Sequence, residues 1–299
     1  MTSRTGPRPN LFIIGAAKSG TTSLHHYLNA HPEVFMSEPK EPGFFVEEMD
    51  YYPKDEAWYL GLFAAAGNAK VIGESSTHYT KLPIYPGVPE RIAAFSPDAR
   101  FIYLMRDPIE RAISHYWHAV RQDAEHRPML RAIQKDVQYT AFSDYRMQLE
   151  PYVDLFGRDR IFLMTFEELT ADPRRAVQEV FRWLGVAPHD GPPAFERKNA
   201  RPPEIERPRG RGLIHRFRFT PFWDRVSPYV PQGLKDRAKR LAVEPVKPSD
   251  EPVDAVVAYL RPMMQEKVRE LSAYLGREFP EWTTVRATAA AADPAGVAV

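Results

Sequence analysis

Short apolar runs alternate with amphipathic stretches along the first 185 residues of the chain. Apolar runs bounded by turn residues are typical of buried strands. The run FIYLM at 101–105 is apolar at each position, which is the pattern of a central strand in a parallel sheet. We predict strands at residues 11–14, 70–73, 101–105 and 160–166.

Helices are predicted at the amphipathic stretches between these strands. Pro108 is at a favoured first-turn position, and Asp172 with Pro173 has the form of a capped helix start that leads to an end at Gly185. Pro262 is expected to kink the last helix. This alternation predicts an α/β fold, in which helices flank a central, mainly parallel sheet and a helical, Pro-rich part follows. The predicted helices cover residues 21–29, 108–121, 139–156, 173–185 and 252–275.

The turn after the first strand carries the first candidate chemistry. Gly15 and Gly20 bound it, and a glycine-rich turn at a helix N-terminus presents N–H groups to an anion. A nucleoside-triphosphatase loop has Gly-Lys-Ser/Thr at its end, whereas Thr21 and Thr22 follow Gly20 here and Lys18 lies inside the loop. The pattern predicts a P-loop-like, three-layer fold with a phosphate site. An ordinary strand–turn–helix with two incidental glycines is the alternative.

A second candidate phosphate site follows the central strand. Arg106 comes directly after residues 101–105, at the strand end where open α/β sheets bind ligands, and Ser114 lies two helical turns further on. A guanidinium group matches two phosphate oxygens. The alternative is that Asp107 caps the helix and Arg106 forms a surface ion pair.

Three segments in this order resemble the sulfotransferases that use 3′-phosphoadenosine 5′-phosphosulfate (PAPS). They are GAAKSGTTSL at 15–24, PKEPGFF at 39–45 and RDPIERAISHYWH at 106–118. The likeness is closest to bacterial members and to the glycan, or heparan-type, branch, and it extends over residues 9–185. It implies transfer of a sulfonate from PAPS to a hydroxyl, or as second choice an amine, with 3′,5′-diphosphoadenosine (PAP) as product. It implies a small-molecule, lipid or glycan acceptor.

The resemblance also implies roles for individual residues. Lys18 would stabilise the leaving phosphate, and Arg106 and Ser114 would bind the 3′-phosphate. The segment RKNARPP at 197–203 resembles the basic loop that closes over the 3′-phosphate, although it could equally be a solvated linker. The residues implied for the phosphosulfate are Lys18, Ser19, Gly20, Thr21 and Thr22, and those of the closing loop are Lys198, Asn199 and Arg201.

The resemblance implies two candidates for the general base that deprotonates the acceptor. In the glycan branch a glutamate in a segment like KEPGFF has this role, which puts it on Glu41; a surface glutamate between two prolines is the alternative. The cytosolic branch uses a histidine, and His78 lies after the second strand. The lysine that the glycan branch has after the residue equivalent to Glu74 is replaced by Ser75, so that cofactor contact is in doubt. Glu41 is the first choice.

Other functions stay open at this point. Glu74 at a strand end could hold magnesium in a kinase or ATPase, although Arg106 stands where a metal-binding acid is expected. A nucleotide-binding scaffold without turnover is a further alternative. His115 and His118 are three apart on a helix, but no third metal ligand lies near them in sequence, so we predict no metal site.

Composition excludes several classes of protein. The chain contains no cysteine, which excludes disulfides and a cysteine nucleophile. A net charge of +1 argues against a general nucleic-acid-binding protein, although residues 195–240 carry 13 basic and 5 acidic residues. The N-terminus lacks the apolar core of a signal peptide, and no apolar run reaches membrane-spanning length. We therefore predict a cytoplasmic protein without a transmembrane segment.

The basic, aromatic stretch His215–Val226 has several interpretations. It could line the acceptor site, touch an anionic membrane surface, form a subunit contact or pack the edge of the domain. The sequence does not indicate an oligomeric state. The predicted organisation is a flexible N-terminus at 1–8, a single sulfotransferase domain at 9–285 (core 9–187, closing loop and acceptor-side part 188–285) and a disordered tail at 286–299.

Overall fold

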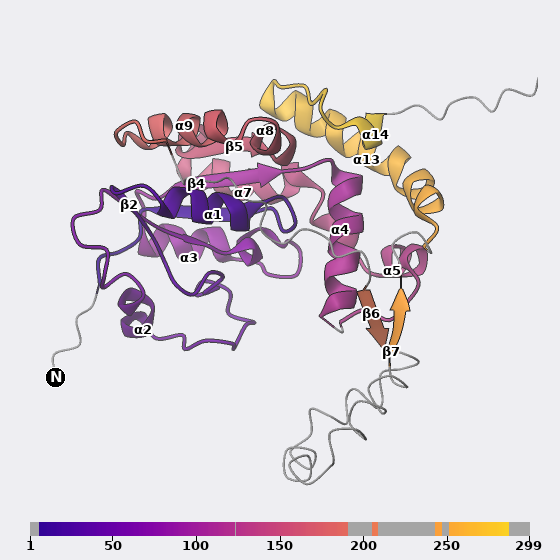
Figure 1. Ribbon diagram of the computed structural model, residues 1–299, viewed down its shortest axis with the longest axis horizontal. Helices are drawn as coiled ribbons and strands as arrows, with labels where there is room; N and C mark the ends of the chain where they lie inside the picture. The colour runs from indigo at the N-terminus through magenta and orange to yellow at the C-terminus, as the bar shows by residue number, and fades with distance from the viewer. Residues whose placement is uncertain (1–5, 123, 191–204, 209–242, 247–250, 287–299) are drawn as a thin grey trace, which may run out of the picture.

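The computed structural model describes residues 6–122, 124–190, 205–208, 243–246 and 251–286. At its centre is a five-stranded parallel sheet with the strand order β2-β3-β1-β4-β5 (Figure 1). The chain first adds strands on one side of β1 and then continues on its other side, so the strand order reverses beside β1. Ligands of open α/β sheets bind at the carboxyl ends of strands near such a reversal. The strands are β1 (Leu11–Gly15), β2 (Val34–Met36), β3 (Val71–Ser75), β4 (Arg100–Met105) and β5 (Ile161–Thr165).

Helices follow most of the strands, and short helical turns occupy several of the loops. Two 3₁₀ turns are present. The turn η1 (Thr77–Thr80) follows β3, and the turn η2 (Arg158–Arg160) precedes β5. The α-helices are α1 (Thr21–Asn29), α2 (Glu56–Gly61), α3 (Val88–Phe95), α4 (Pro108–Arg121), α5 (Met129–Lys135), α6 (Gln138–Ala141), α7 (Tyr145–Phe156), α8 (Phe166–Ala171), α9 (Pro173–Leu184), α13 (Val253–Leu275) and α14 (Thr283–Arg286).

Alternate residues of the central strands form two cores. Leu11 and Ile13 of β1 pack with α1, α8 and α9 on one face, whereas Phe12 and Ile14 pack with α3, α4, α7 and α13 on the other. Each fully buried side chain of this size contributes roughly 1.5–3 kcal/mol. The predicted three-layer α/β fold is confirmed.

Capping residues set the starts of helices α4 and α9. The side chain of Asp107 accepts from the N–H groups of Ile109 (3.0 Å) and Glu110 (3.3 Å), and Pro108 is the first residue of α4. Asp172 caps α9, which ends at the left-handed Gly185. These starts and the end at Gly185 agree with the sequence prediction because they depend on local residues alone.

Several elements differ from the prediction. Strand β2 was not predicted because its three residues are too few to make a periodic pattern. The predicted helix at 139–156 is divided into α6 and α7, since Asp144 accepts from the N–H of Met147 (3.3 Å) and starts a new helix. The strands β6 (Ile205–Pro208) and β7 (Val243–Val246) form an antiparallel pair that no sequence pattern indicated. Helix α13 continues through Pro262.

Candidate active site

The turn between β1 and α1, residues 15–20, forms an open helix start, and we call it the phosphate loop. Lys18 and Gly20 have left-handed backbone angles, with φ of 73° and 91°. A β-carbon at Gly20 would lie 2.9 Å from the Phe166 ring, so both space and backbone angle require glycine. Gly20 is the N-cap of α1, and no side chain of the described residues caps this helix. The first N–H groups of α1 therefore offer an anion site.

Ser19 and Lys18 add polar groups that have no partner in the described part of the chain. Ser19 is fully buried, and its Oγ makes no hydrogen bond among the described residues. The Lys18 ammonium forms no ion pair with any described acid. Burial above all, and then the charges of Arg121, Arg106 and Lys40, lower the pKa of Lys18 to about 8, while Glu41 opposes the shift. A bound anion would relieve this repulsion between cations.

Thr21 and Thr22 lie in the first turn of α1, as predicted. Thr21 is buried and Thr22 is half-buried. Their position puts them beside the open N–H groups, so the structure brings together the five predicted residues 18–22.

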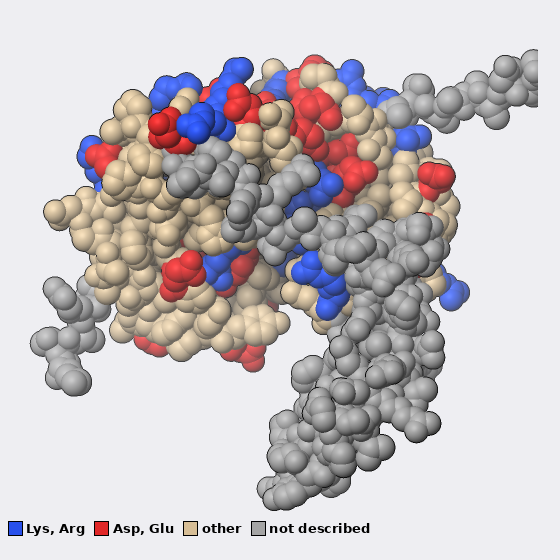
Figure 2. Space-filling view, in the orientation of Figure 1, with Lys and Arg blue, Asp and Glu red and all other residues tan. Residues whose placement is uncertain are grey.

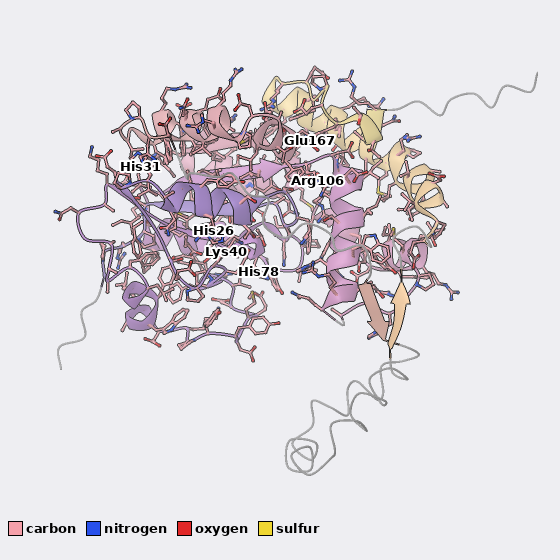
Figure 3. All side chains as sticks on the ribbon, viewed as in Figure 1. His26, His31, Lys40, His78, Arg106 and Glu167 are labelled. Atoms are coloured by element: carbon pink, nitrogen blue, oxygen red, sulfur yellow. The ribbon has the colours of Figure 1, made fainter. Side chains whose placement is uncertain are left out.

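Arg106 lies at the carboxyl end of β4, next to the phosphate loop (Figure 3). Its guanidinium group is 3.4 Å from the carbonyl oxygen of Lys18, 3.3 Å from Glu110 Oε2 and over the Phe166 ring at 4.8 Å. The Tyr145 hydroxyl donates to the carbonyl of Arg106 (2.7 Å) and holds its backbone. The ion pair of the alternative interpretation is present, but it belongs to an arginine that also contacts the phosphate loop.

Ser114 lies on α4 two turns after Arg106. It is half-buried, and its hydroxyl makes no hydrogen bond to another described residue. Helical spacing places His118 and Arg121 on the same face of α4 as Ser114. Arg121 and Lys18 both lower the pKa of His118, which burial above all brings to about 4. This face of α4 therefore points toward the phosphate loop.

Sequence reasoning missed three of the basic groups in this region. Arg121 and Lys81 were not singled out, and His118 was considered only as a metal ligand. Lys81 follows η1, and burial lowers its pKa to about 8 while the negative charge of Glu41 opposes that shift. The four- and seven-residue spacings of His118 and Arg121 from Ser114 could have revealed the residues on α4, whereas no local signal marks Lys81. In the space-filling view, basic side chains lie beside α4 (Figure 2).

Glu41 lies on the other side of this region, and we call residues 41–43 the base turn. The N–H of Thr77 donates to Glu41 Oε2 (2.7 Å), and the Thr77 hydroxyl lies 3.2 Å from the same oxygen. Lys40 pairs with Oε1, and His78 Nδ1 lies 3.3 Å from Oε2. Burial favours a higher pKa for Glu41, but the contacts with His78 and Lys40 outweigh it and hold the pKa well below the usual range.

The two candidate bases are therefore neighbours. His78 is in η1, where burial lowers its pKa and the Glu41 carboxylate partly offsets that effect. Figure 3 shows Lys40 and His78 near each other, and the charge of Lys40 helps to lower the pKa of His78. The β3–η1 segment and the base turn bring together two residues that are 37 positions apart in sequence.

Two predicted alternatives can be compared with the structure. Glu74 is fully buried, and both of its carboxylate oxygens accept hydrogen bonds from side-chain hydroxyls, which does not suit a magnesium ligand. His115 stacks on Phe142 (ring centroids 5.7 Å apart), and burial lowers its pKa well below the usual value. Among the described residues, no three His, Cys, Asp or Glu side chains are grouped as metal ligands.

The remaining predicted residues cannot be placed. Lys198, Asn199, Arg201 and the stretch His215–Val226 lie outside the described residues.

Comparison with known proteins agrees with this geometry. Residues 8–198 match the model of the sulfotransferase domain family, so the chain belongs to that family, as the sequence motifs predicted. It is similar to a crystal structure of a sulfotransferase from Alicyclobacillus acidocaldarius, with a TM-score of 0.67 and 25% identity over 92% of this chain and 99% of that one.

Two mammalian proteins match a part of the chain. One is the bifunctional heparan sulfate N-deacetylase/N-sulfotransferase 2 of Bos taurus, 26% identical over 60% of this chain and 22% of that protein. The other is the heparan sulfate glucosamine 3-O-sulfotransferase 3B1 of Mus musculus, 29% identical over 60% of this chain and 46% of that protein. The chain thus spans less than half the length of these relatives.

In the part of the chain that the structure describes, no helix has the length and apolar character needed to cross a membrane.

Proposed function

We propose that this chain transfers a sulfonate group from PAPS to a hydroxyl, or as second choice an amine, of an acceptor molecule. The observation that carries the proposal is a cationic group at an open helix N-terminus, near a carboxylate–imidazole group, whose central lysine has no acidic partner among the described residues. Lys18 belongs to the first group, and Glu41 and His78 belong to the second. Sulfonyl transfer needs both, because one side takes the leaving phosphate while the other takes a proton.

The donor would bind with its phosphosulfate at residues 18–22. The N–H groups of α1, the Ser19 hydroxyl and the Lys18 ammonium are the donors that a phosphate and a sulfonate require. Arg106, which contacts the loop, and Ser114, which lies on α4 behind it, would bind the 3′-phosphate. Membership of the sulfotransferase domain family supports PAPS as donor.

The reaction exchanges one bond to sulfur for another. The acceptor oxygen forms a bond to sulfur as the bond from sulfur to the phosphate oxygen breaks, and PAP leaves with the electron pair. Negative charge develops on that oxygen, where the Lys18 ammonium stabilises it. The proton of the acceptor hydroxyl goes to the base.

Glu41 is the proposed base, assisted by its neighbour His78. In the ligand-free protein its pKa is too low for an efficient base, because Lys40 and His78 stabilise the carboxylate. A sulfonate near Lys18 would compete with Glu41 for the Lys40 ammonium. Loss of that contact raises the pKa of Glu41 and makes its carboxylate a better proton acceptor at the moment when the donor is in place.

The acceptor is proposed to be a small molecule, a lipid or a glycan. The names of the two mammalian relatives include heparan sulfate, which supports a glycan. Their partial coverage leaves the three classes open to experiment, and the cytoplasmic location stays a prediction.

Two measurements test the proposed function. The first compares thermal stabilisation by PAP with that by MgATP. The second incubates the protein with PAPS and acceptor extracts and searches by mass spectrometry for products with one added sulfonate. We expect stabilisation by PAP and PAPS-dependent products that a Lys18→Ala variant does not form. Stabilisation by MgATP alone would contradict the proposal, and PAP binding without product or PAPS hydrolysis would indicate a scaffold.

A further inference from the structure

Beneath the base turn lies a buried carboxylate that the proposed reaction does not use. Glu74 is in β3 and is fully buried. The hydroxyls of Tyr59 (2.6 Å) and Tyr79 (2.7 Å) donate to its Oε1, and the hydroxyl of Ser76 (2.6 Å) donates to its Oε2. Burial of a carboxylate is costly unless hydrogen bonds compensate it, and here they occupy both oxygens.

Ser76 connects this carboxylate to the base turn. Its side chain is fully buried, and the N–H of Gly43 donates to its Oγ (3.0 Å). A hydroxyl has a single proton. Because that proton goes to Glu74, the lone pairs of Ser76 Oγ are left to accept from Gly43. The chain of bonds thus runs from the Gly43 N–H through Ser76 to Glu74.

The base turn needs such support because its backbone is unfavourable. Glu41 and Gly43 have left-handed φ angles of 63° and 57°. For a glutamate this conformation costs about 1–3 kcal/mol and persists only where surrounding contacts hold it. The N–H of Glu41 donates to the carbonyl of Ser75 (2.9 Å), and the N–H of Thr77 donates to the Glu41 carboxylate (2.7 Å).

Lys54 holds the outer side of the same turn. Its ammonium donates to the carbonyl oxygens of Gly43 and Val46, both at 2.8 Å. Gly43 is therefore fixed through its N–H by Ser76 and through its carbonyl by Lys54. Among the side-chain hydrogen bonds of the described residues, those of Ser76 connect the turn to the buried acid.

We infer that Glu74 is a positioning residue, which acts through Ser76 to hold the base turn so that the Glu41 carboxylate stays against Thr77 and His78. This inference rests on the proposed function, in which Glu41 takes the proton. Glu74 itself touches neither donor nor acceptor. Its contribution is to orient a hydroxyl that the base turn requires.

The test uses the full chain and four variants. Ser76→Ala removes the link, Ser76→Thr keeps a hydroxyl, and Glu74→Gln keeps the size of the side chain but cannot accept from Ser76 through its nitrogen. Ser96→Ala is the matched control, because the Ser96 hydroxyl is also buried and donates to the carbonyl of Pro9 (2.8 Å), away from the base turn. Release of PAP from PAPS, with water as acceptor, measures turnover.

We expect Ser76→Ala to lower kcat about tenfold or more, the size of effect that misplacement of a catalytic group produces. The KM for PAPS and the affinity for PAP stay within about twofold of the unmodified protein, since the phosphate loop is unchanged. Ser76→Thr should keep most of the kcat of the unmodified protein, and Ser96→Ala should keep all of it. Glu74→Gln should lower kcat several-fold. Unchanged kcat in both Ser76→Ala and Glu74→Gln, with only a loss of thermal stability, would overturn the inference.

Hydrogen exchange separates this inference from the proposed function. Ser76→Ala is expected to accelerate exchange at the Gly43 amide, whereas Ser96→Ala leaves it unchanged. If the unmodified protein neither binds PAP nor consumes PAPS, the proposed function fails, and the exchange result still decides whether Ser76 holds the turn. Normal turnover together with unchanged Gly43 exchange in Ser76→Ala refutes the inference alone.

Discussion

The phosphate loop and the base turn face each other across the candidate site, and they differ in what holds them. The phosphate loop connects β1 to α1, so its path depends on neighbours in sequence. The base turn is held by hydrogen bonds from residues 74–77, more than 30 positions away. Both contain a non-glycine residue with left-handed φ, Lys18 in one and Glu41 in the other.

The two regions also differ in whether their charged groups have partners. Lys18 has no acidic partner in the described chain, whereas Glu41 contacts Lys40, Thr77 and His78. The first region is therefore prepared to receive an anion, and the second releases its base only when a contact is lost. In the proposed function, donor binding and base activation would be coupled through Lys40, because its charge acts on both Lys18 and Glu41.

The largest expected effect comes from Lys18. Lys18→Ala should reduce sulfonate transfer about 10³-fold, because it removes the charge that stabilises the leaving phosphate. The melting temperature should not fall, since the protein loses a cation that burial disfavours. Lys135→Ala, an exposed lysine on α5, is the control. Equal turnover in the two variants would contradict the proposed role of Lys18 and the contrast drawn between the two regions.

Glu41 tests the other region. Glu41→Gln should lower kcat about 10²-fold or more, with PAP affinity unchanged, because proton transfer is lost while the phosphate loop remains. His78→Gln should have a smaller effect if the imidazole only supports the carboxylate. Full turnover in Glu41→Gln with none in His78→Gln would transfer the role of base to His78.

The buried acid beneath the base turn should make stability depend on pH. Burial raises the pKa of Glu74 to about 7, although its hydrogen bonds oppose the shift. Between pH 4.5 and 7 the folded protein holds a proton that the unfolded chain releases, so the contribution of Glu74 to stability falls as pH rises through this window.

The unfolding free energy of the unmodified protein, measured relative to that of Glu74→Gln, should therefore fall by roughly 3 kcal/mol as pH rises from 4.5 to 7. Above pH 7 this difference between the two proteins should remain constant. Denaturant titrations of both proteins between pH 5 and 8 measure the difference. A difference that does not change with pH would show that Glu74 has the same charge in the folded and unfolded states.

The smallest expected effect is at Arg106. Arg106→Lys should weaken PAP binding about tenfold, because a lysine cannot present two N–H groups to a phosphate or lie flat over the Phe166 ring. Isothermal titration with PAP measures it, and Arg146→Lys on α7 is a control arginine away from the phosphate loop. Equal affinities for PAP would place the 3′-phosphate elsewhere.

Local sequence was sufficient for much of the fold and for the donor side of the site. Four strands, the caps of α4 and α9 and the phosphate loop follow from neighbouring residues, and the family assignment is confirmed. Strand β2 and the break between α6 and α7 were missed because three residues of strand and a single capping aspartate give little pattern. The assignment of residues to donor and base roles stays a prediction.

The amino-acid order alone determined that a glycine turn and a helix start follow the first strand, because both are properties of adjacent residues, and it predicted an anion site there. Tertiary structure decided the rest. It paired Glu41 with His78. It buried Glu74, which accepts a hydrogen bond from Ser76. It also brought Lys81 and Arg121 close enough to His118 to lower the pKa of that residue. These contacts join segments far apart in the chain, and only the packing of the sheet determines which of them meet.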